Sequence, residues 1–116
     1  MTAAVVVWCS VPTAELGQKL ARTLVEERWA ACVHMLPAGR SIYVWQGRLE
    51  DETEHLLMIK TRAALFEGLC QRLRALHPYQ VPEILATPVS AGLPQYLAWL
   101  QAETAEASSD AGERQD

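Results

Sequence analysis

Apolar positions in the first third of the chain form one short run followed by one helical stripe. Residues 5–9 (VVVWC) are consecutive β-branched and aromatic residues, a run typical of a strand buried on both faces in the middle of a sheet. Leucines then recur every four residues from Leu16 to Leu24, with charged residues between them. That spacing predicts an amphipathic helix, capped by Thr13 and ending near Arg28.

Two apolar segments of strand length follow, residues 30–36 and 41–46, separated by Pro37, Ala38 and Gly39. The second alternates aliphatic and aromatic residues. We expect one long strand with a kink or bulge at that separation. Gly47 and the acidic residues after it predict a turn, and residues 54–60 predict a returning strand that completes a hairpin.

The second half repeats the order of the first. Thr61 stands at a strand–helix boundary, leucines at helical spacing run from Leu65 to Leu76, and residues 84–87 predict a strand. Residues 93–101 then predict a short final helix with one leucine face.

Two strand–helix–strand units joined by a hairpin predict an α/β (α+β) fold, a ferredoxin-like βαββαβ sandwich with a long central hairpin and a short C-terminal helix. In this topology the third strand inserts between the first and second, and the fourth flanks the first. Gly17 and Gly68 lie inside the two main helices, where each costs ~1 kcal/mol relative to Ala. We expect both to allow close approach of helix and sheet.

Composition fits one globular domain with an acidic extension. The chain has 116 residues, half of them hydrophobic, and a formal net charge of −4. The acids of residues 103–116 account for all of that charge, because residues 1–102 carry equal numbers of acidic and basic side chains. We expect a single domain over 1–102, a disordered tail over 103–116, and no nucleic-acid role, because no basic patch is present.

The cysteines and the apolar runs predict a cytoplasmic protein with no membrane partner. Cys9, Cys32 and Cys70 are odd in number and widely spaced, so we expect free thiols. No apolar run approaches the roughly 20 residues that a membrane span needs.

Strand direction in the expected fold brings three side chains that bind metals to one end of the sheet. Cys9 ends the first strand, His77 ends the second helix and Glu83 precedes the last strand, whereas Lys60 lies at the opposite end. Thiolate, imidazole and carboxylate together suit copper or zinc. The alternative is purely structural: a core cysteine, a histidine at a helix C-terminus and a glutamate bonded to loop amides.

The proline-rich segment 77–83 (HPYQVPE) predicts a rigid loop that serves either as a site or as a plain connection. The acids at 50, 51, 52 and 54 favour a solvated hairpin over a weak cation site. His34 and His55 are each expected to be hydrogen-bonded sheet residues rather than ligands.

An enzyme is the least favoured class. Cys9 could act as a nucleophile with His77 as its base. However, the sequence contains no oxyanion loop, Gly-rich phosphate cradle or paired-acid motif.

Six segments, at intervals from residue 5 to residue 100, resemble the CutA divalent-cation tolerance family: VVVWCSVP, AACV, SIYVWQG, IKT, HPYQVPE and YLAWL. The resemblance implies a ferredoxin-like fold in a tight homotrimer. Bacterial members are linked to tolerance of copper and other divalent cations, and animal relatives to acetylcholinesterase anchoring. The trimer also resembles those of PII signalling proteins, which implies small-ligand sensing in clefts between subunits.

By motif position, the resemblance associates Cys9, His77 and Glu83 with metal. It also places a second set of residues around the intersubunit region: Tyr43, Trp45, Lys60, Tyr79 and Trp99. We expect Trp29, Trp45 and Trp99 to be buried between subunits, since a long hairpin and a four-stranded sheet leave unpaired edges.

The sequence therefore predicts a cytoplasmic homotrimer that binds a divalent cation, copper foremost, and contributes to metal tolerance without catalysing a reaction. The alternative is a trimeric small-ligand-sensing or protein-assembly module whose metal affinity is incidental.

Overall fold

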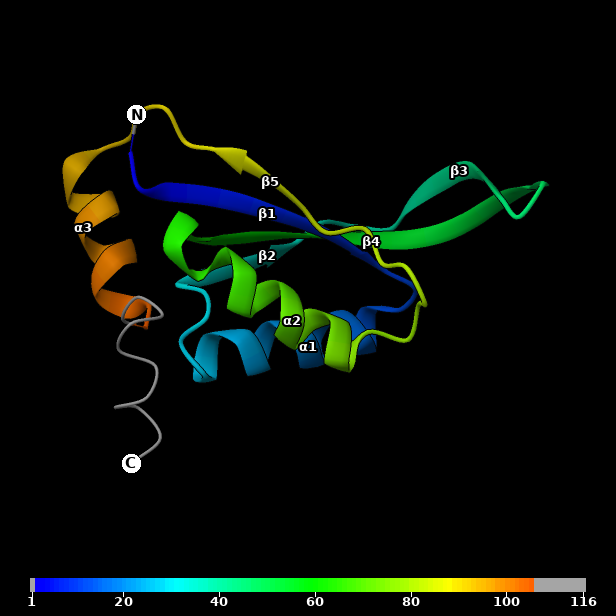
Figure 1. The fold of residues 1–116 in the computed structure, drawn as a ribbon, viewed down its shortest axis with the longest axis horizontal. Helices are drawn as coiled ribbons and strands as arrows, with labels where there is room; N and C mark the ends of the chain where they lie inside the picture. Colours follow the sequence, from blue (N-terminus) through cyan, green and yellow to red (C-terminus); the bar gives the residue numbers. More distant parts are fainter. Residues whose placement is uncertain (1, 106–116) are drawn as a thin grey trace.

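The computed structural model describes residues 2–105, which form a mixed α/β fold (Figure 1). In chain order the elements are β1 (Ala4–Val11), α1 (Ala14–Glu26), β2 (Cys32–Met35), β3 (Gly39–Trp45), β4 (Arg48–Arg62), a 3₁₀ turn (Ala63–Leu65), α2 (Phe66–Leu76), β5 (Leu85–Pro88) and α3 (Pro94–Glu103).

The sheet has five strands and every pairing is antiparallel. Its order is β2-β4-β1-β5, and β3 pairs with the other half of β4. The long returning strand β4 therefore inserts between β1 and β2, and β5 flanks β1. The ferredoxin-like topology predicted from the two strand–helix–strand units is confirmed.

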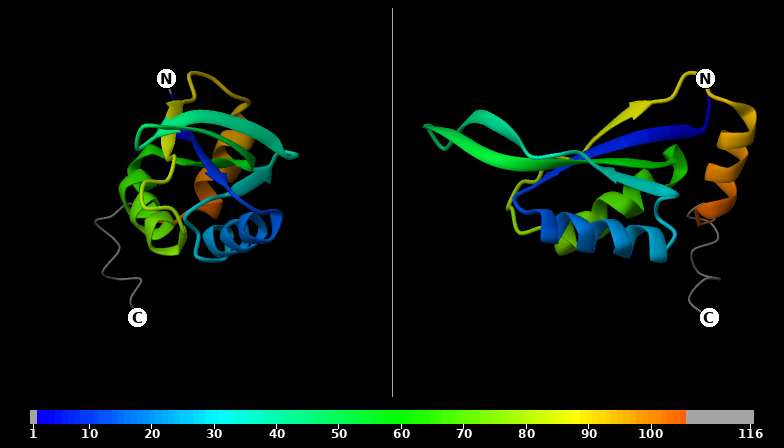
Figure 2. Two further views of the ribbon diagram at one scale, coloured as in Figure 1. Left: turned by 90° about the vertical axis from the view of Figure 1, so that its right-hand side faces the viewer. Right: turned by 180° about the vertical axis from the view of Figure 1, so that it is seen from behind.

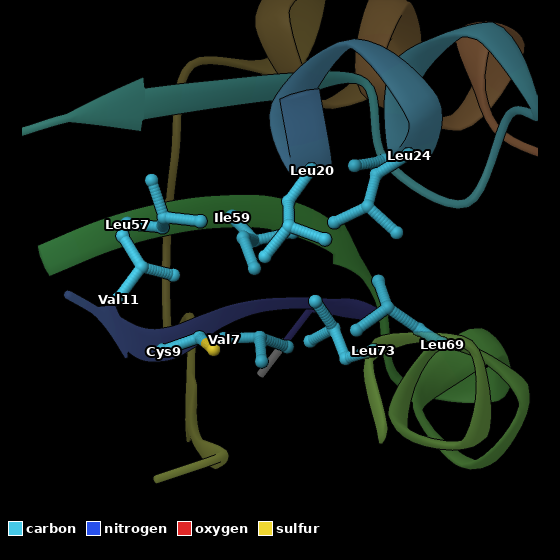
Figure 3. Packing of buried hydrophobic residues seen from close by; sticks show 10 residues of the cluster. Val7, Cys9, Val11, Leu20, Leu24, Leu57, Ile59, Leu69 and Leu73 are labelled. Atoms are coloured by element: carbon cyan, nitrogen blue, oxygen red, sulfur yellow. The ribbon is translucent and has the colours of Figure 1, made fainter. Parts of the chain in front are cut away.

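One face of the sheet is covered by α1 and α2, and α3 packs across one end (Figure 2). Side chains from β1, β4 and both helices form the core between these layers (Figure 3). Its fully buried members include Val7, Leu24, Ile59 and Leu73. The central position of β1 agrees with the unbroken apolar run that predicted it.

The middle of the chain differs from the predicted single kinked strand. Pro37 follows Leu36, whose N–H donates to Leu56 O at 2.9 Å, and the chain then restarts as the separate strand β3. Proline has no N–H to continue the ladder, so an interruption there is expected. The β3–β4 hairpin extends well beyond the helices (Figure 1).

The hairpin turn is shorter than predicted. Gln46 and Gly47 both have positive φ, 51° and 80°, as in the two-residue turns that match the twist of paired strands. Strand pairing resumes at Arg48, opposite Trp45, so the acidic run lies within β4 and not in a turn.

Of the two threonines placed at helix starts, one is confirmed. Thr13 Oγ1 accepts a hydrogen bond from Leu16 N at 3.1 Å and caps α1. Thr61 does not begin a helix. It is a buried residue of β4 whose hydroxyl donates to Trp29 O at 2.7 Å, because the strand continues to Arg62.

The helix glycines do permit close packing. A Cβ on Gly17 would lie 2.7 Å from Met35 Sδ and 3.2 Å from Val11 Cγ2, both in the sheet. A Cβ on Gly68 would lie 2.5 Å from the ring of Trp29, in the segment after α1. Close approach to the sheet is confirmed for Gly17, whereas Gly68 accommodates an aromatic ring.

Helix α3 is held at its C-terminal end by Arg28. Its Nη2 donates to Ala102 O at 2.7 Å and to Thr104 O at 3.3 Å, and Ala105 N donates to Arg28 O at 2.7 Å. Thr104 and Ala105 are buried. Residues 103–105 of the segment expected to be a tail therefore pack on the domain, and residues 106–116 lie outside the described residues.

Candidate functional site

Three segments meet where β1 ends: the terminus of α2, the loop that leads to β5, and the base of the hairpin (Figure 1). His77 is the C-cap of α2, with its backbone N–H donating to Leu73 O at 2.8 Å. The loop after it is rich in proline, as the sequence indicated. This end of the sheet contains Cys9, His77 and Glu83.

His77 holds the loop to β1 with both of its ring nitrogens. Nε2 lies 2.7 Å from Ser10 O, and Nδ1 accepts from Tyr79 N at 3.1 Å. Because a carbonyl only accepts and an amide N–H only donates, this pattern requires a neutral imidazole with its proton on Nε2. While both bonds stand, His77 has no lone pair for a metal ion.

Cys9 is fully buried, and its Sγ lies 3.8 Å from Ser10 O. Burial, reinforced by the negative charge of Glu83, raises the pKa of the Cys9 thiol to about 12. The thiol therefore keeps its proton at neutral pH, and His77 is bonded to Ser10 instead of to the sulfur. A Cys9–His77 nucleophile pair is not assembled in this arrangement.

Glu83 is the exposed member of the predicted ligand set. Within residues 2–105, no group of three or more His, Cys, Asp or Glu side chains is placed to hold one ion. The topology brings Cys9, His77 and Glu83 to the same end of the sheet without converging their ligand atoms. Their assignment as metal ligands stays a prediction.

An open groove of about 1000 Å³ lies at this same end. The hairpin contributes Tyr43 and Trp45 to its lining, and the loop contributes Tyr79. Three carboxylates also line it, those of Glu52, Glu54 and Glu83. Among the lining residues that the structure describes, none is Lys, Arg or His.

Glu54 is a groove residue whose importance the sequence did not reveal. It is only 7% exposed, and its Oε2 accepts from Tyr79 Oη at 2.6 Å. Burial, and then this hydrogen bond, raise the pKa of Tyr79 above its usual range, so the phenol keeps its proton and donates it. Burial and the nearby carboxylates, first Glu54, also raise the pKa of Tyr43.

One sequence signal could have separated Glu54 from the other acids of the hairpin. Glu54 is the last acidic residue before the apolar part of β4, at the point where that strand enters the body of the sheet. Asp51, in contrast, forms an exposed ion pair with Arg40 at 2.9 Å.

The residues expected around an intersubunit cleft divide between the two ends of the sheet. Tyr43, Trp45 and Tyr79 line the groove. Lys60 lies at the other end, with Nζ 5.7 Å from the ring centre of Tyr96, whose ring is 5.4 Å from that of Trp99. The position of Lys60 away from the predicted ligands agrees with the strand directions.

Within the described part of the chain, neither His34 nor His55 belongs to a group of three or more side chains that could hold a metal ion. His34 is exposed on β2. His55, on β4, has a buried Nδ1 for which the described residues supply no hydrogen-bond partner. The expectation that both are hydrogen-bonded sheet residues is therefore not met at Nδ1 of His55.

Comparisons with known proteins identify the family. The family profile described as CutA1 divalent ion tolerance protein matches residues 5–103. The divalent-cation tolerance protein CutA of Thermus thermophilus is 48% identical over 99 residues, which cover 85% of this chain and 96% of that protein. A solved structure of a T. thermophilus divalent cation tolerance protein (Cut A1) superposes with a TM-score of 0.86 at 46% identity, covering 88% of this chain and 99% of the other.

The family extends beyond bacteria. Protein CutA, chloroplastic, of Arabidopsis thaliana is 44% identical over 100 residues, which cover 86% of this chain and 55% of that protein. This chain thus spans about half the length of that relative. Because one relative is named as a chloroplast protein, family membership does not assign a compartment.

Across residues 2–105, the helices are all too short or too polar to cross a membrane. The family and the two T. thermophilus proteins described above are named for tolerance of divalent cations and not for a reaction. From the profile match, the identity to proteins of known family and the shared fold, this chain belongs to the CutA1 divalent ion tolerance protein family.

Proposed function

We propose that this protein is a cytoplasmic homotrimer that binds a divalent cation, copper foremost, in metal tolerance and catalyses no reaction. The observation that carries the proposal is the acidic groove at the end of β1. It is lined by the carboxylates of Glu52, Glu54 and Glu83 and, among described residues, by no basic side chain. Such a surface concentrates cations electrostatically.

Self-association is supported by the apolar side chains that the hairpin exposes. Ile42, Val44 and Leu49 are 67%, 68% and 74% exposed. Aliphatic side chains gathered on a projecting hairpin are typical of a surface that a partner covers. The family resemblance favours three copies of the chain.

The ligand set that we propose combines Glu83 with Cys9 and His77. Glu83 is accessible, so it would make the first contact with the cation. His77 could bind only after releasing Ser10 O or Tyr79 N, and Cys9 only when the ion displaces the thiol proton into solvent. Copper is favoured because it has the highest affinity among divalent first-row metals for nitrogen, sulfur and oxygen ligands.

Titration calorimetry with Cu²⁺ tests this ligand set. We expect Glu83→Gln and His77→Gln each to weaken binding by about tenfold or more. Glu26→Gln, at an exposed position on α1, should leave it unchanged. Wild-type affinity in both Glu83→Gln and His77→Gln would refute the assignment.

Light scattering tests the assembly. The wild-type protein should have the mass of three chains at micromolar concentration, and Val44→Glu should shift it toward smaller species. A wild-type mass of one chain would refute the trimer.

A second candidate function is supported by the size of the groove. About 1000 Å³ is far more space than a bare ion occupies, and it lies at the upper end of small-molecule pockets. We therefore also propose a small-ligand-sensing role, with metal affinity as an accompanying property.

A further inference from the structure

The groove contains aromatic side chains that a metal ion does not require. Tyr43 and Trp45 come from β3 and Tyr79 from the loop, and the first two are 39% and 40% exposed. The Tyr79 hydroxyl is already used in its bond to Glu54, and the indole ring has no lone pair that a divalent ion would take. The rings instead offer flat faces with negative potential, which attract a cation with an organic surface.

The carboxylates beside these rings are suited to an organic cation, in which the positive charge is attached to an apolar group. Glu54 is nearly buried and its direction is fixed by the 2.6 Å bond from Tyr79 Oη. Glu52 and Glu83 are exposed at the same groove. A carboxylate next to an aromatic face is the pairing that binds ammonium groups, since charge and ring quadrupole act together.

The remaining lining fits the rest of such a molecule. Val81 and Pro82 contribute apolar surface to the groove. Its volume of about 1000 Å³ accommodates a molecule of many heavy atoms. Because no described lining residue is basic, no charged side chain there would pair with an anionic ligand, and a neutral ligand would gain nothing from the charge of the carboxylates.

We infer that this groove binds a small organic ammonium cation with an apolar body, its charged end beside the carboxylates and its body against the rings of Tyr43, Trp45 and Tyr79. The inference rests on the small-ligand role proposed above and specifies the chemistry of the ligand.

Benzylamine and benzyl alcohol form a matched pair of probes, because they have nearly the same shape and only the amine is charged at neutral pH. In calorimetric titrations of the full chain at low salt, we expect benzylamine to bind about tenfold more tightly than benzyl alcohol. The difference should shrink as salt is added, because the carboxylates are partly exposed.

Two tryptophans of similar exposure, Trp45 and Trp99, provide the control. Trp45→Leu should weaken benzylamine binding about fivefold, whereas Trp99→Leu, which changes a 43% exposed tryptophan on α3, should not. Cu²⁺ affinity should be the same in both variants, because neither ring is a proposed metal ligand. Glu83→Gln should weaken both benzylamine and Cu²⁺ binding.

The outcomes distinguish failure of the ammonium inference from failure of the proposed functions. Equal affinity for the two probes would overturn the ammonium inference while leaving a small-ligand groove. Binding of neither probe at millimolar concentration would overturn the inference together with the small-ligand role, and the Cu²⁺ titration would still report on metal binding. Unchanged benzylamine affinity in Trp45→Leu would refute the placement in this groove.

Discussion

The hydrogen bond between Tyr79 and Glu54 is the link between the proline-rich loop and the hairpin, and removing it should destabilise the protein measurably. Tyr79→Phe deletes one oxygen and leaves the ring in place. A hydrogen bond to a charged group contributes about 1.5–3 kcal/mol. Because Tyr79 is half-buried and water can reach part of the site, we expect the free energy of unfolding to fall by about 1–2 kcal/mol.

Tyr43 supplies the matched control, because it lines the same groove and its hydroxyl has no hydrogen-bond partner among the described residues. Tyr43→Phe should change the free energy of unfolding by less than about 0.5 kcal/mol. Urea denaturation at one fixed protein concentration measures both variants, since self-association makes apparent stability depend on concentration.

A second substitution tests whether the carboxylate charge contributes. Glu54→Gln keeps an acceptor oxygen and removes the charge, so Tyr79→Phe should cost less in that background than in the wild type. The reasoning fails if Tyr79→Phe destabilises no more than Tyr43→Phe, or if its cost is the same with Gln at position 54.

Three further predictions concern the fold that supports the site. The pKa of the Cys9 thiol is raised in the folded state to about 12 from a usual value of 9.0. The contribution of the protonated thiol to the free energy of unfolding is therefore complete below about pH 8 and is lost as the pH rises. Between about pH 8 and about pH 10 in urea titrations, wild type should lose ~1 kcal/mol more stability than Cys9→Ala, and an equal loss in the two proteins would refute this. Gly68→Ala should lower the free energy of unfolding by about 1 kcal/mol despite alanine's higher helix propensity, because the new Cβ meets the Trp29 ring at 2.5 Å; a stabilised variant in thermal melts would contradict this. Thr13→Ala should cost about 1 kcal/mol through loss of the α1 cap and Thr13→Ser much less, and equal melts would show that the cap contributes nothing.

Local patterns in the sequence determined most of the secondary structure. Three local features predicted their elements: the apolar run of β1, the leucine spacing of α1 and α2, and the glycine of the hairpin turn. Each depends only on residues a few positions apart in the sequence. Once the order of strands and helices indicated a ferredoxin-like fold, the direction of each strand followed from that order. For this reason the common position of Cys9, His77 and Glu83 at one end of the sheet was predictable.

Boundaries were less predictable where tertiary contacts outweigh local preference. Thr61 has the residue type of a helix cap, but its hydroxyl is taken by Trp29 O, 32 residues away, and β4 continues past it. The acidic run looked like a turn, yet pairing with β3 keeps it extended.

Only the tertiary structure decided what the end of the sheet can do. Nothing in the sequence indicates that Ser10 O and Tyr79 N occupy both nitrogens of His77, or that the hydroxyl of Tyr79 donates to Glu54. Each of these contacts except the one within the loop joins segments at least 25 residues apart. Hydrophobic periodicity indicates which face of a helix or strand a residue occupies. Whether a ligand atom is free to bind a metal depends instead on whether a group distant in the sequence forms a hydrogen bond with it.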